Sequence, residues 1–160
     1  MSKEHIYIDI AEQIKVVTAE ENNIIARMAT VSCLLSEAFP DFFWTGFYLV
    51  DEEKPDELVI GPYQGSLGCL RIAFGRGVCG AAAASGQTQL VDNVHDFPGH
   101  IACDNRSLSE IVVPVFNQAQ ALIAVLDIDS EKPANFDQTD RRYLEQIMAD
   151  VFGRCTIDPD

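Results

Sequence analysis

Hydrophobic positions recur at helical spacing through the first forty residues of the chain. Between residues 10 and 38 they follow a broken 3.6-residue period, which is typical of amphipathic helix. The positions are Ile10, Ile14, Val17, Ile24, Ile25, Met28, Val31, Leu34 and Leu35. Asn22 and Asn23 interrupt this period and indicate a break between two helices.

Segments rich in β-branched and aromatic residues follow, separated by polar or glycine-bearing turns. They predict strands at residues 42–50, 57–63, 69–73, 89–91, 111–116 and 122–128. The first two flank an acidic, proline-containing loop, and the last two flank a short polar turn. Each of these pairs is therefore expected to form an antiparallel hairpin.

Two further helices are expected in the second half of the chain. An alanine-rich stretch at residues 78–84 favours a small helix that ends at Gly86. Residues 138–152 form a closing helix, for which Asp137 is a plausible N-cap. Residues 92–109 show no periodicity, which is typical of a functional loop. The order predicts an α+β sandwich, with a mostly antiparallel central sheet, terminal helices on one face and a loop-covered pocket on the other.

Composition narrows the class of protein. The 160 residues fit one domain, taken here as residues 1–160 with a core at about 20–152. A net charge of -14 disfavours binding to nucleic acid or to anionic membrane surfaces, but would not repel a ligand that carries an ammonium group. We find no signal-peptide core and no apolar run long enough to cross a bilayer, so the cytoplasm is the expected compartment.

Five cysteines in a cytosolic protein are not expected to form a permanent disulfide framework. Cys33 lies within a helical segment and fits a small buried apolar residue. Cys69, Cys79 and Cys103 instead lie in loops or at element ends. Cys79 falls in the first turn of the small helix, where the helix dipole favours a thiolate, and Cys103 follows His100 closely, which could activate it.

Three kinds of thiol chemistry remain open at this point. A metal site is weakly supported, because no two of these cysteines form a C-x-x-C pair and the histidines lack zinc spacing. A cysteine protease needs an orienting group and an oxyanion site beyond Cys–His. Redox turnover, in which one thiol is oxidised and a second resolves it as a disulfide, fits best.

Carboxylates accompany these thiols. On the strand at 122–128 and just after it, Asp127 and Asp129 share one face, because side chains alternate along a strand. The simpler alternative is that Asp129 begins a turn and Asp127 is exposed. Glu110 precedes a β-rich run that contains Pro114, so a helix-capping role is weak and a position at the mouth of a strand is favoured.

Two aromatic residues with polar ends lie four positions apart on the first strand. Trp44 and Tyr48 therefore share a face. Ordinary sheet packing is one interpretation. The other is a pocket wall that holds a methyl or thioether group.

Together these segments resemble the free methionine-R-sulfoxide reductases, which are single GAF-type domains. The resemblance runs from about residue 20 to residue 151. Its most specific segments are WTGFY (44–48), GPYQG (61–65), GRGVCG (75–80), FPGHIACD (97–104) and LDIDS (126–130). In one departure, Ala73 stands where a proline is expected.

The resemblance implies roles for individual residues. Cys103 would be the catalytic nucleophile, Cys69 the resolving thiol and Cys79 an auxiliary thiol. Glu110 and Asp127 would assist protonation. The implied substrate-binding residues are Trp44, Tyr48, Ile101, Ala102, Glu110, Asp127 and Asp129.

The implied activity is reduction of free L-methionine-(R)-sulfoxide to methionine through a sulfenic acid and a disulfide. Neither a cofactor nor a metal is expected, and thioredoxin or a similar dithiol would restore the thiols. The N-terminal helix could support a homodimer. The alternative function is a non-enzymatic GAF module that senses a small molecule or redox state, which would need neither the cysteine set nor the paired acids.

Overall fold

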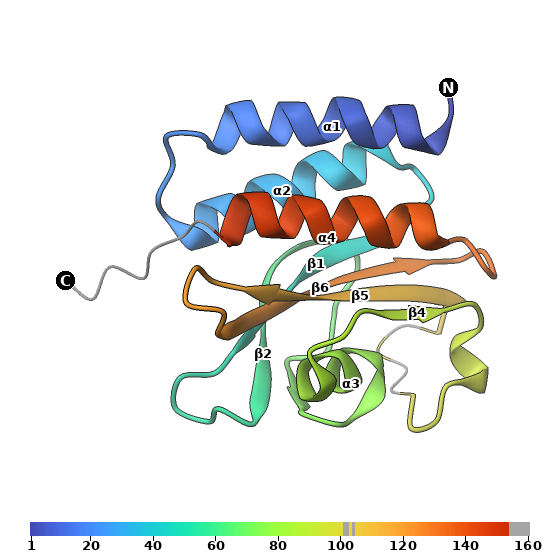
Figure 1. Ribbon diagram of the computed structural model, residues 1–160. Coiled ribbons are helices and arrows are strands. Elements are labelled where there is room, and N and C mark those ends of the chain that lie inside the picture. Colours follow the sequence, from blue (N-terminus) through green and yellow to red (C-terminus); the bar gives the residue numbers. More distant parts are fainter. Residues whose placement is uncertain (101–102, 104, 154–160) are drawn as a thin grey trace.

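A six-stranded antiparallel sheet separates three helices from a fourth (Figure 1). The computed structural model describes residues 1–100, 103 and 105–153. The helices are α1 (Lys3–Thr18), α2 (Ile24–Ala38), α3 (Gly77–Ser85) and α4 (Gln138–Phe152), with a 3-10 turn at Val94–Asp96. Helices α1, α2 and α4 form a layer on one face of the sheet, and α3 lies on the opposite face.

The sheet has the strand order β3-β2-β1-β6-β5-β4. Its strands are β1 (Trp44–Val50), β2 (Glu57–Gln64), β3 (Arg71–Ala73), β4 (Gln89–Val91), β5 (Ser109–Phe116) and β6 (Leu122–Ser130). The two expected hairpins, β1–β2 and β5–β6, are both present and antiparallel. The central pair β1–β6 joins strands from the two hairpins and brings Trp44 opposite Asp129.

Alternation along the strands gives the sheet two apolar faces. Phe47, Leu126 and Ile128 face the three-helix layer and are fully buried there. Tyr48 and Val125 face the other way and pack with residues of α3. Because both faces are covered, Asp127 on the α3 side of β6 is buried and Asp129 is partly buried.

The N-terminal helix is longer than the sequence pattern predicted. Helix was expected from residue 10, but α1 begins at Lys3, where the Ser2 side chain accepts a hydrogen bond from the His5 amide. Tyr7 is fully buried and donates a hydrogen bond to Asp140 at 2.5 Å, which fastens α1 to the first turn of α4. This early turn was missed because its stabilising contact comes from 133 residues further along the chain.

Other boundaries follow the pattern closely. Asn23 caps α2, Gly86 adopts the left-handed conformation after α3, and Asp137 caps α4 in a reciprocal capping box with Asp140. β1 and β3 each begin two residues later than expected, at Trp44 and Arg71. The α+β sandwich prediction is confirmed.

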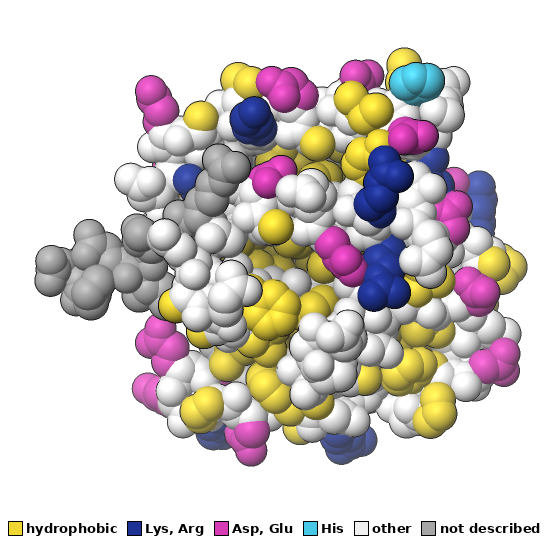
Figure 2. Space-filling view, in the orientation of Figure 1, with side chains coloured by type: hydrophobic (Ala, Val, Ile, Leu, Met, Phe, Trp, Pro, Cys, Tyr) yellow, Lys and Arg dark blue, Asp and Glu magenta, His cyan; other side chains and the backbone are white. Residues whose placement is uncertain are grey.

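The surface of the helical layer carries many charges. Acidic side chains are spread over the face in Figure 2, whereas Lys and Arg occur in fewer places, in keeping with 25 acidic and 11 basic residues. Apolar side chains show between them. Across the part of the chain that the structure describes, every helix is too short or too polar to cross a membrane.

Candidate active site

A pocket opens on the α3 side of the sheet, between β1, β6, β5 and the start of α3. The space between its walls amounts to about 530 Å³, its open mouth included. Its walls are formed by Phe43, Trp44, Tyr48, Leu67, Gly68, Ile72, Arg76, Gly77, Val78, Cys79, His100, Cys103, Ser107, Glu110, Asp127 and Asp129. All the described residues that the sequence singled out for substrate binding are among them.

Cys69 and Cys103 form a disulfide. Their Cα atoms are 5.4 Å apart, although 34 positions separate them in the sequence. Cys103 lines the pocket, whereas Cys69 lies outside its wall in the segment between β2 and β3. The pair therefore joins the edge of the β2–β3 segment to the long loop before β5.

Three carboxylates gather on the pocket face of β5 and β6. Glu110 lies opposite Asp129 in the ladder, and Asp127 is two residues from Asp129 on the same face. Glu110 and Asp127 are both only 6% exposed. Ser107 donates a hydrogen bond to Asp129 at 2.8 Å. The expectation that the two aspartates share one face is confirmed, and the exposed-face alternative for Asp127 is wrong.

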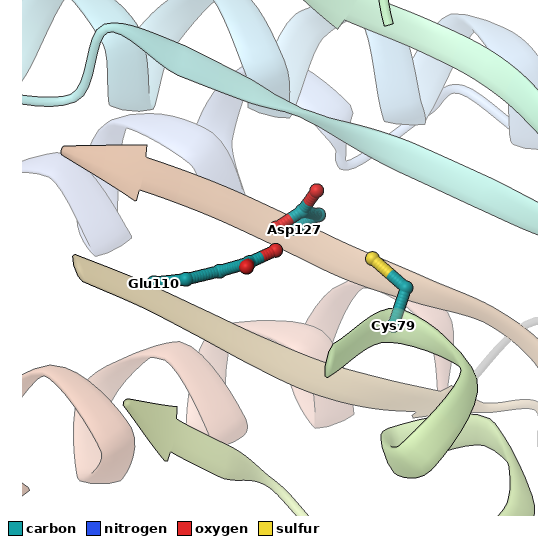
Figure 3. Close-up of side chains that lie close together, drawn as sticks. All are labelled: Cys79, Glu110 and Asp127. Carbon is teal, nitrogen blue, oxygen red and sulfur yellow. The ribbon is translucent and has the colours of Figure 1, made fainter. Parts of the chain in front are cut away.

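Cys79 completes this cluster from the opposite side of the pocket. Figure 3 shows its side chain, on the first turn of α3, pointing towards Glu110 on β5 and Asp127 on β6. The Sγ atom and one oxygen of each carboxylate lie within 4.8 Å of one another.

Burial decides which of these groups holds a proton. Loss of solvation raises the pKa of Glu110 well above its usual range, and the charges of Asp127 and Asp129 raise it further. Burial also raises the pKa of Asp127, but protonated Glu110 and Cys79 stabilise its carboxylate and oppose that shift. Glu110 is thus the stronger holder of a proton within the coupled cluster.

Cys79 lies in the first turn of α3, as expected, but its surroundings oppose the thiolate that the helix dipole favours. Burial raises the pKa of its thiol well above the usual range, and the charges of Asp127, Glu110 and Asp129 raise it further. A helix dipole contributes about 0.3–1 kcal/mol in exposed settings, which is small beside the cost of a buried charge next to carboxylates. Cys79 therefore remains a thiol at neutral pH.

The protons held by Glu110 and Cys79 oppose metal binding at this cluster. Cys79, Glu110 and Asp127 are close enough to share a divalent cation, but ligands must be deprotonated to bind one. Oδ1 of Asp127 is buried and has no hydrogen-bond partner among the residues that the structure describes. An unpaired buried acceptor favours a ligand that brings a donor group, such as an ammonium group or a hydroxyl.

An aromatic wall closes the β1 side of the pocket. The rings of Trp44 and Tyr48 stack with centroids 5.8 Å apart, and Trp44 also stacks on Tyr63 at 4.9 Å. The Trp44 indole N–H donates a hydrogen bond to the carbonyl of Ser66 at 2.8 Å. Burial raises the pKa of Tyr48, so its hydroxyl stays protonated beside the acids.

Several pocket residues were not predicted from the sequence. Arg76, at the start of α3, brings a cation to the pocket wall, and no ion pair involving it is found among the described residues. The neighbouring glycines of the GRGVCG segment are a sequence signal for a backbone-lined site that could have drawn attention to it. Ser107 had no such signal, because its role depends on the position of Asp129.

Two other predictions concern the long loop. His100 lines the pocket, and burial lowers its pKa, which fits a neutral loop residue better than an activating cation. Ile101 and Ala102 lie outside the described residues, so their predicted contacts with substrate stay predictions.

The chain is similar over most of its length to proteins of one family. The GAF domain family matches residues 32–151. GAF domain-containing protein A of Dictyostelium discoideum is 50% identical over 147 residues, which cover 92% of this chain and 90% of that protein. Free methionine-R-sulfoxide reductase of Escherichia coli K12 is 44% identical over 151 residues, which cover 94% of this chain and 89% of the reductase. The chain belongs to the free methionine-R-sulfoxide reductase family of GAF domains.

A solved structure of a family member has the same fold as this chain. The reductase of Neisseria meningitidis, determined in complex with its substrate, superposes with a TM-score of 0.90 at 48% identity. The match covers 94% of this chain and 89% of that chain. The family resemblance predicted from the sequence is confirmed.

Proposed function

We propose that this protein reduces free methionine-R-sulfoxide to methionine at the pocket between β1, β6, β5 and α3. The observation that carries the proposal is the Cys69–Cys103 disulfide at a pocket that also holds a proton-retaining carboxyl group, Glu110. A sulfoxide reductase needs both a thiol pair that can be oxidised and an acid that can protonate oxygen. Relatives that bear the name of this activity are 44% and 35% identical to the chain.

The first step is attack of the Cys103 thiolate on the sulfoxide sulfur. The sulfoxide oxygen is a poor leaving group unless it gains a proton, and Glu110 supplies that proton. The Cys103–sulfur bond forms first. The hydroxyl oxygen then moves to Cys103 as the substrate S–O bond and the Cys103–sulfur bond break, and methionine leaves. Cys103 is then a sulfenic acid, and the sulfoxide has been reduced by two electrons.

The second step returns the cysteine to a recyclable state. The Cys69 sulfur attacks the Cys103 sulfenic sulfur and the S–O bond breaks. The leaving hydroxide takes up the proton that the Cys69 thiol has lost and departs as water. The product is the disulfide seen in the structure. An external dithiol, for which thioredoxin is our proposal, then restores both thiols at its own expense. A reducing compartment such as the cytoplasm would supply it.

The pocket offers a complementary surface to each end of the substrate. The ammonium group would lie against Asp127 and Asp129, whose charges favour a cation. Oδ1 of Asp127 receives no hydrogen bond from the described residues and could accept one from this group. The carboxylate would meet the Arg76 guanidinium and the uncapped amides at the start of α3. The methyl group would pack on Trp44 and Tyr48.

Dimerisation is a separate proposal. Apolar side chains of α1 and α2 face solvent, Ile8 at 50% and Ile25 at 47% exposure. A second copy of the chain could cover them.

We also infer that residues 1–160 form one GAF domain, because α1 packs on α2 and α4 and is anchored to α4 through Tyr7 and Asp140.

The decisive assay uses dithiothreitol as reductant and three substrates: free methionine-R-sulfoxide, the S epimer and a peptide-bound sulfoxide. Turnover of the first alone is expected. Equal activity on the peptide-bound sulfoxide would overturn the proposal, because a pocket lined by Arg76 and the acids requires both free amino-acid groups.

Two cysteine variants assign the roles. Cys103→Ser should lose turnover altogether, whereas Cys69→Ser should complete about one turnover and then stall with an oxidised Cys103. Mass spectrometry of the stalled protein identifies the sulfenic acid or its trapped adduct. Full multiple-turnover activity of Cys103→Ser would rule out the mechanism.

A further inference from the structure

Two exposed leucines flank the resolving cysteine. Leu67 is 77% exposed and Leu70 is 68% exposed, and Cys69 lies between them. Among the described residues, the other exposed large apolar side chains all lie before β1, and of these only Met1 is more exposed than the two leucines; they are Met1, Ile8, Val16, Val17 and Ile25. In the part of the molecule that the structure describes, Leu67 and Leu70 are thus the large exposed apolar side chains that lie beside Cys69 in the chain.

Their exposure is imposed by the backbone around them. The Trp44 indole donates to the Ser66 carbonyl at 2.8 Å, and the Ile60 amide donates to the Leu70 carbonyl at 3.0 Å. These two hydrogen bonds hold the segment at both ends.

The inner side of the segment is already filled. A β-carbon placed on Gly68 would lie 3.0 Å from Trp44 and 3.1 Å from the Tyr48 hydroxyl. These distances are shorter than ordinary contact, so the backbone lies directly on the aromatic wall. Leu67 borders the pocket mouth and Leu70 lies outside the wall, and both side chains are exposed while the disulfide is formed.

The two sulfur atoms of the disulfide differ in position. Cys103 lines the pocket, whereas Cys69 does not. A reductant that attacks Cys69 expels Cys103 as a thiolate that already faces the substrate site. Attack on Cys103 would instead leave the reductant bound at the mouth of the pocket.

We propose that Leu67 and Leu70 form the docking surface for a protein dithiol reductant, which attacks the Cys69 sulfur. The inference rests on the proposed function, since it names how that same disulfide is recycled. An apolar partner surface is favoured because two leucines exposed by more than two thirds gain free energy when an apolar surface covers them.

A reductant thiolate attacks Cys69 Sγ, a mixed disulfide forms, and the Cys69–Cys103 bond breaks with its electron pair on Cys103. The second reductant thiol then attacks the mixed disulfide and releases the Cys69 thiolate. The reductant leaves as a disulfide, and its two protons and two electrons remain on Cys69 and Cys103.

The test compares two reductants on one variant. Leu70 does not line the pocket, so Leu70→Ser should turn over free methionine-R-sulfoxide with dithiothreitol at the wild-type rate. With thioredoxin and its reductase, the KM for thioredoxin should rise about tenfold. Leu70→Met, which keeps an apolar side chain, should restore the wild-type KM. An unchanged KM for thioredoxin in Leu70→Ser, or an equal loss with both reductants, would overturn the docking surface.

A second measurement identifies the attacked sulfur without any sulfoxide. Oxidised protein is mixed with thioredoxin that lacks its second active-site cysteine, and the mixed disulfide is digested and mapped by mass spectrometry. A thioredoxin adduct on Cys69 is expected, and an adduct on Cys103 contradicts the inference. Failure of the proposed function is seen separately, as absent dithiothreitol-driven turnover by the wild-type protein.

Discussion

Glu110 of β5 lies directly opposite Asp129 of β6, so two acids face each other across the antiparallel ladder. Like charges in this position destabilise a sheet. Asp127 lies two residues away on the same face and adds a third carboxyl group. The cluster keeps a proton because burial and mutual repulsion make a fully ionised state costly.

The first prediction concerns the proton donor. Glu110→Gln removes the transferable proton and should lower kcat for free methionine-R-sulfoxide by about 10²–10⁴-fold. In the wild type, kcat should fall as pH rises through the raised pKa of Glu110, because the carboxyl then loses its proton. Rate–pH profiles of both proteins are the measurement. A pH-independent kcat in the wild type would argue against Glu110 as the acid.

Glu110→Gln should lower activity but make the folded protein more stable relative to the wild type at high pH. The pKa of Glu110 is higher in the folded protein than in the unfolded chain, so the folded state binds more protons above the unfolded pKa. Wild-type stability should therefore decline as pH rises through the folded pKa, whereas Glu110→Gln lacks this decline. Thermal unfolding at a series of pH values should show the melting temperature of the variant rising relative to that of the wild type as pH increases. Parallel curves would contradict the prediction.

Cys79 should not take part in the disulfide. Its thiol is buried and its pKa is raised, so it neither attacks a sulfenic acid readily nor competes with Cys69. After one equivalent of substrate, Cys79→Ala should yield the same amount of Cys69–Cys103 disulfide as the wild type. Peptide mapping under non-reducing conditions measures this yield, and Cys69→Ala is the matched control in which the disulfide is lost.

Arg76 should contribute to binding of the substrate carboxylate. Arg76→Gln is expected to raise the KM for free methionine-R-sulfoxide about tenfold through loss of a charge-assisted hydrogen bond. Arg71→Gln is the control, because Arg71 is held by Asp51 at 2.6 Å and Glu57 at 3.1 Å. The carboxylate-free analogue 3-(methylsulfinyl)propylamine should be turned over equally by wild type and Arg76→Gln. A KM increase of the same size with this amine would exclude the carboxylate contact.

The contact between α1 and α4 should matter for stability rather than for catalysis. Tyr7→Phe removes the donor to Oδ1 of the buried Asp140, whose Oδ2 still accepts from Lys3 and from the Asp137 amide. The loss should cost about 1–3 kcal/mol in the free energy of unfolding. Tyr143→Phe removes a hydrogen bond to Glu4 on the surface and should change that free energy by less than about 0.5 kcal/mol. Urea unfolding of the two variants separates the effects, and kcat should be unchanged in both.

The sequence determined the elements and the chemistry types, because these depend on local order. Helical and strand periodicity placed α2, α3, α4 and the two hairpins within a few residues of their bounds. Alternation along β6 correctly put Asp127 and Asp129 on one face. The resemblance named the cysteine set and the acids from short segments.

Tertiary structure decided what those residues can do. Whether Cys79 is a thiolate or a thiol depends on burial against Glu110 and Asp127, which come from two other elements. The early start of α1, the place of Arg76 on the pocket wall and the exposure of Leu70 likewise depend on contacts between segments far apart in the chain. Periodicity cannot report such contacts, because desolvation and charge proximity depend on distance in space.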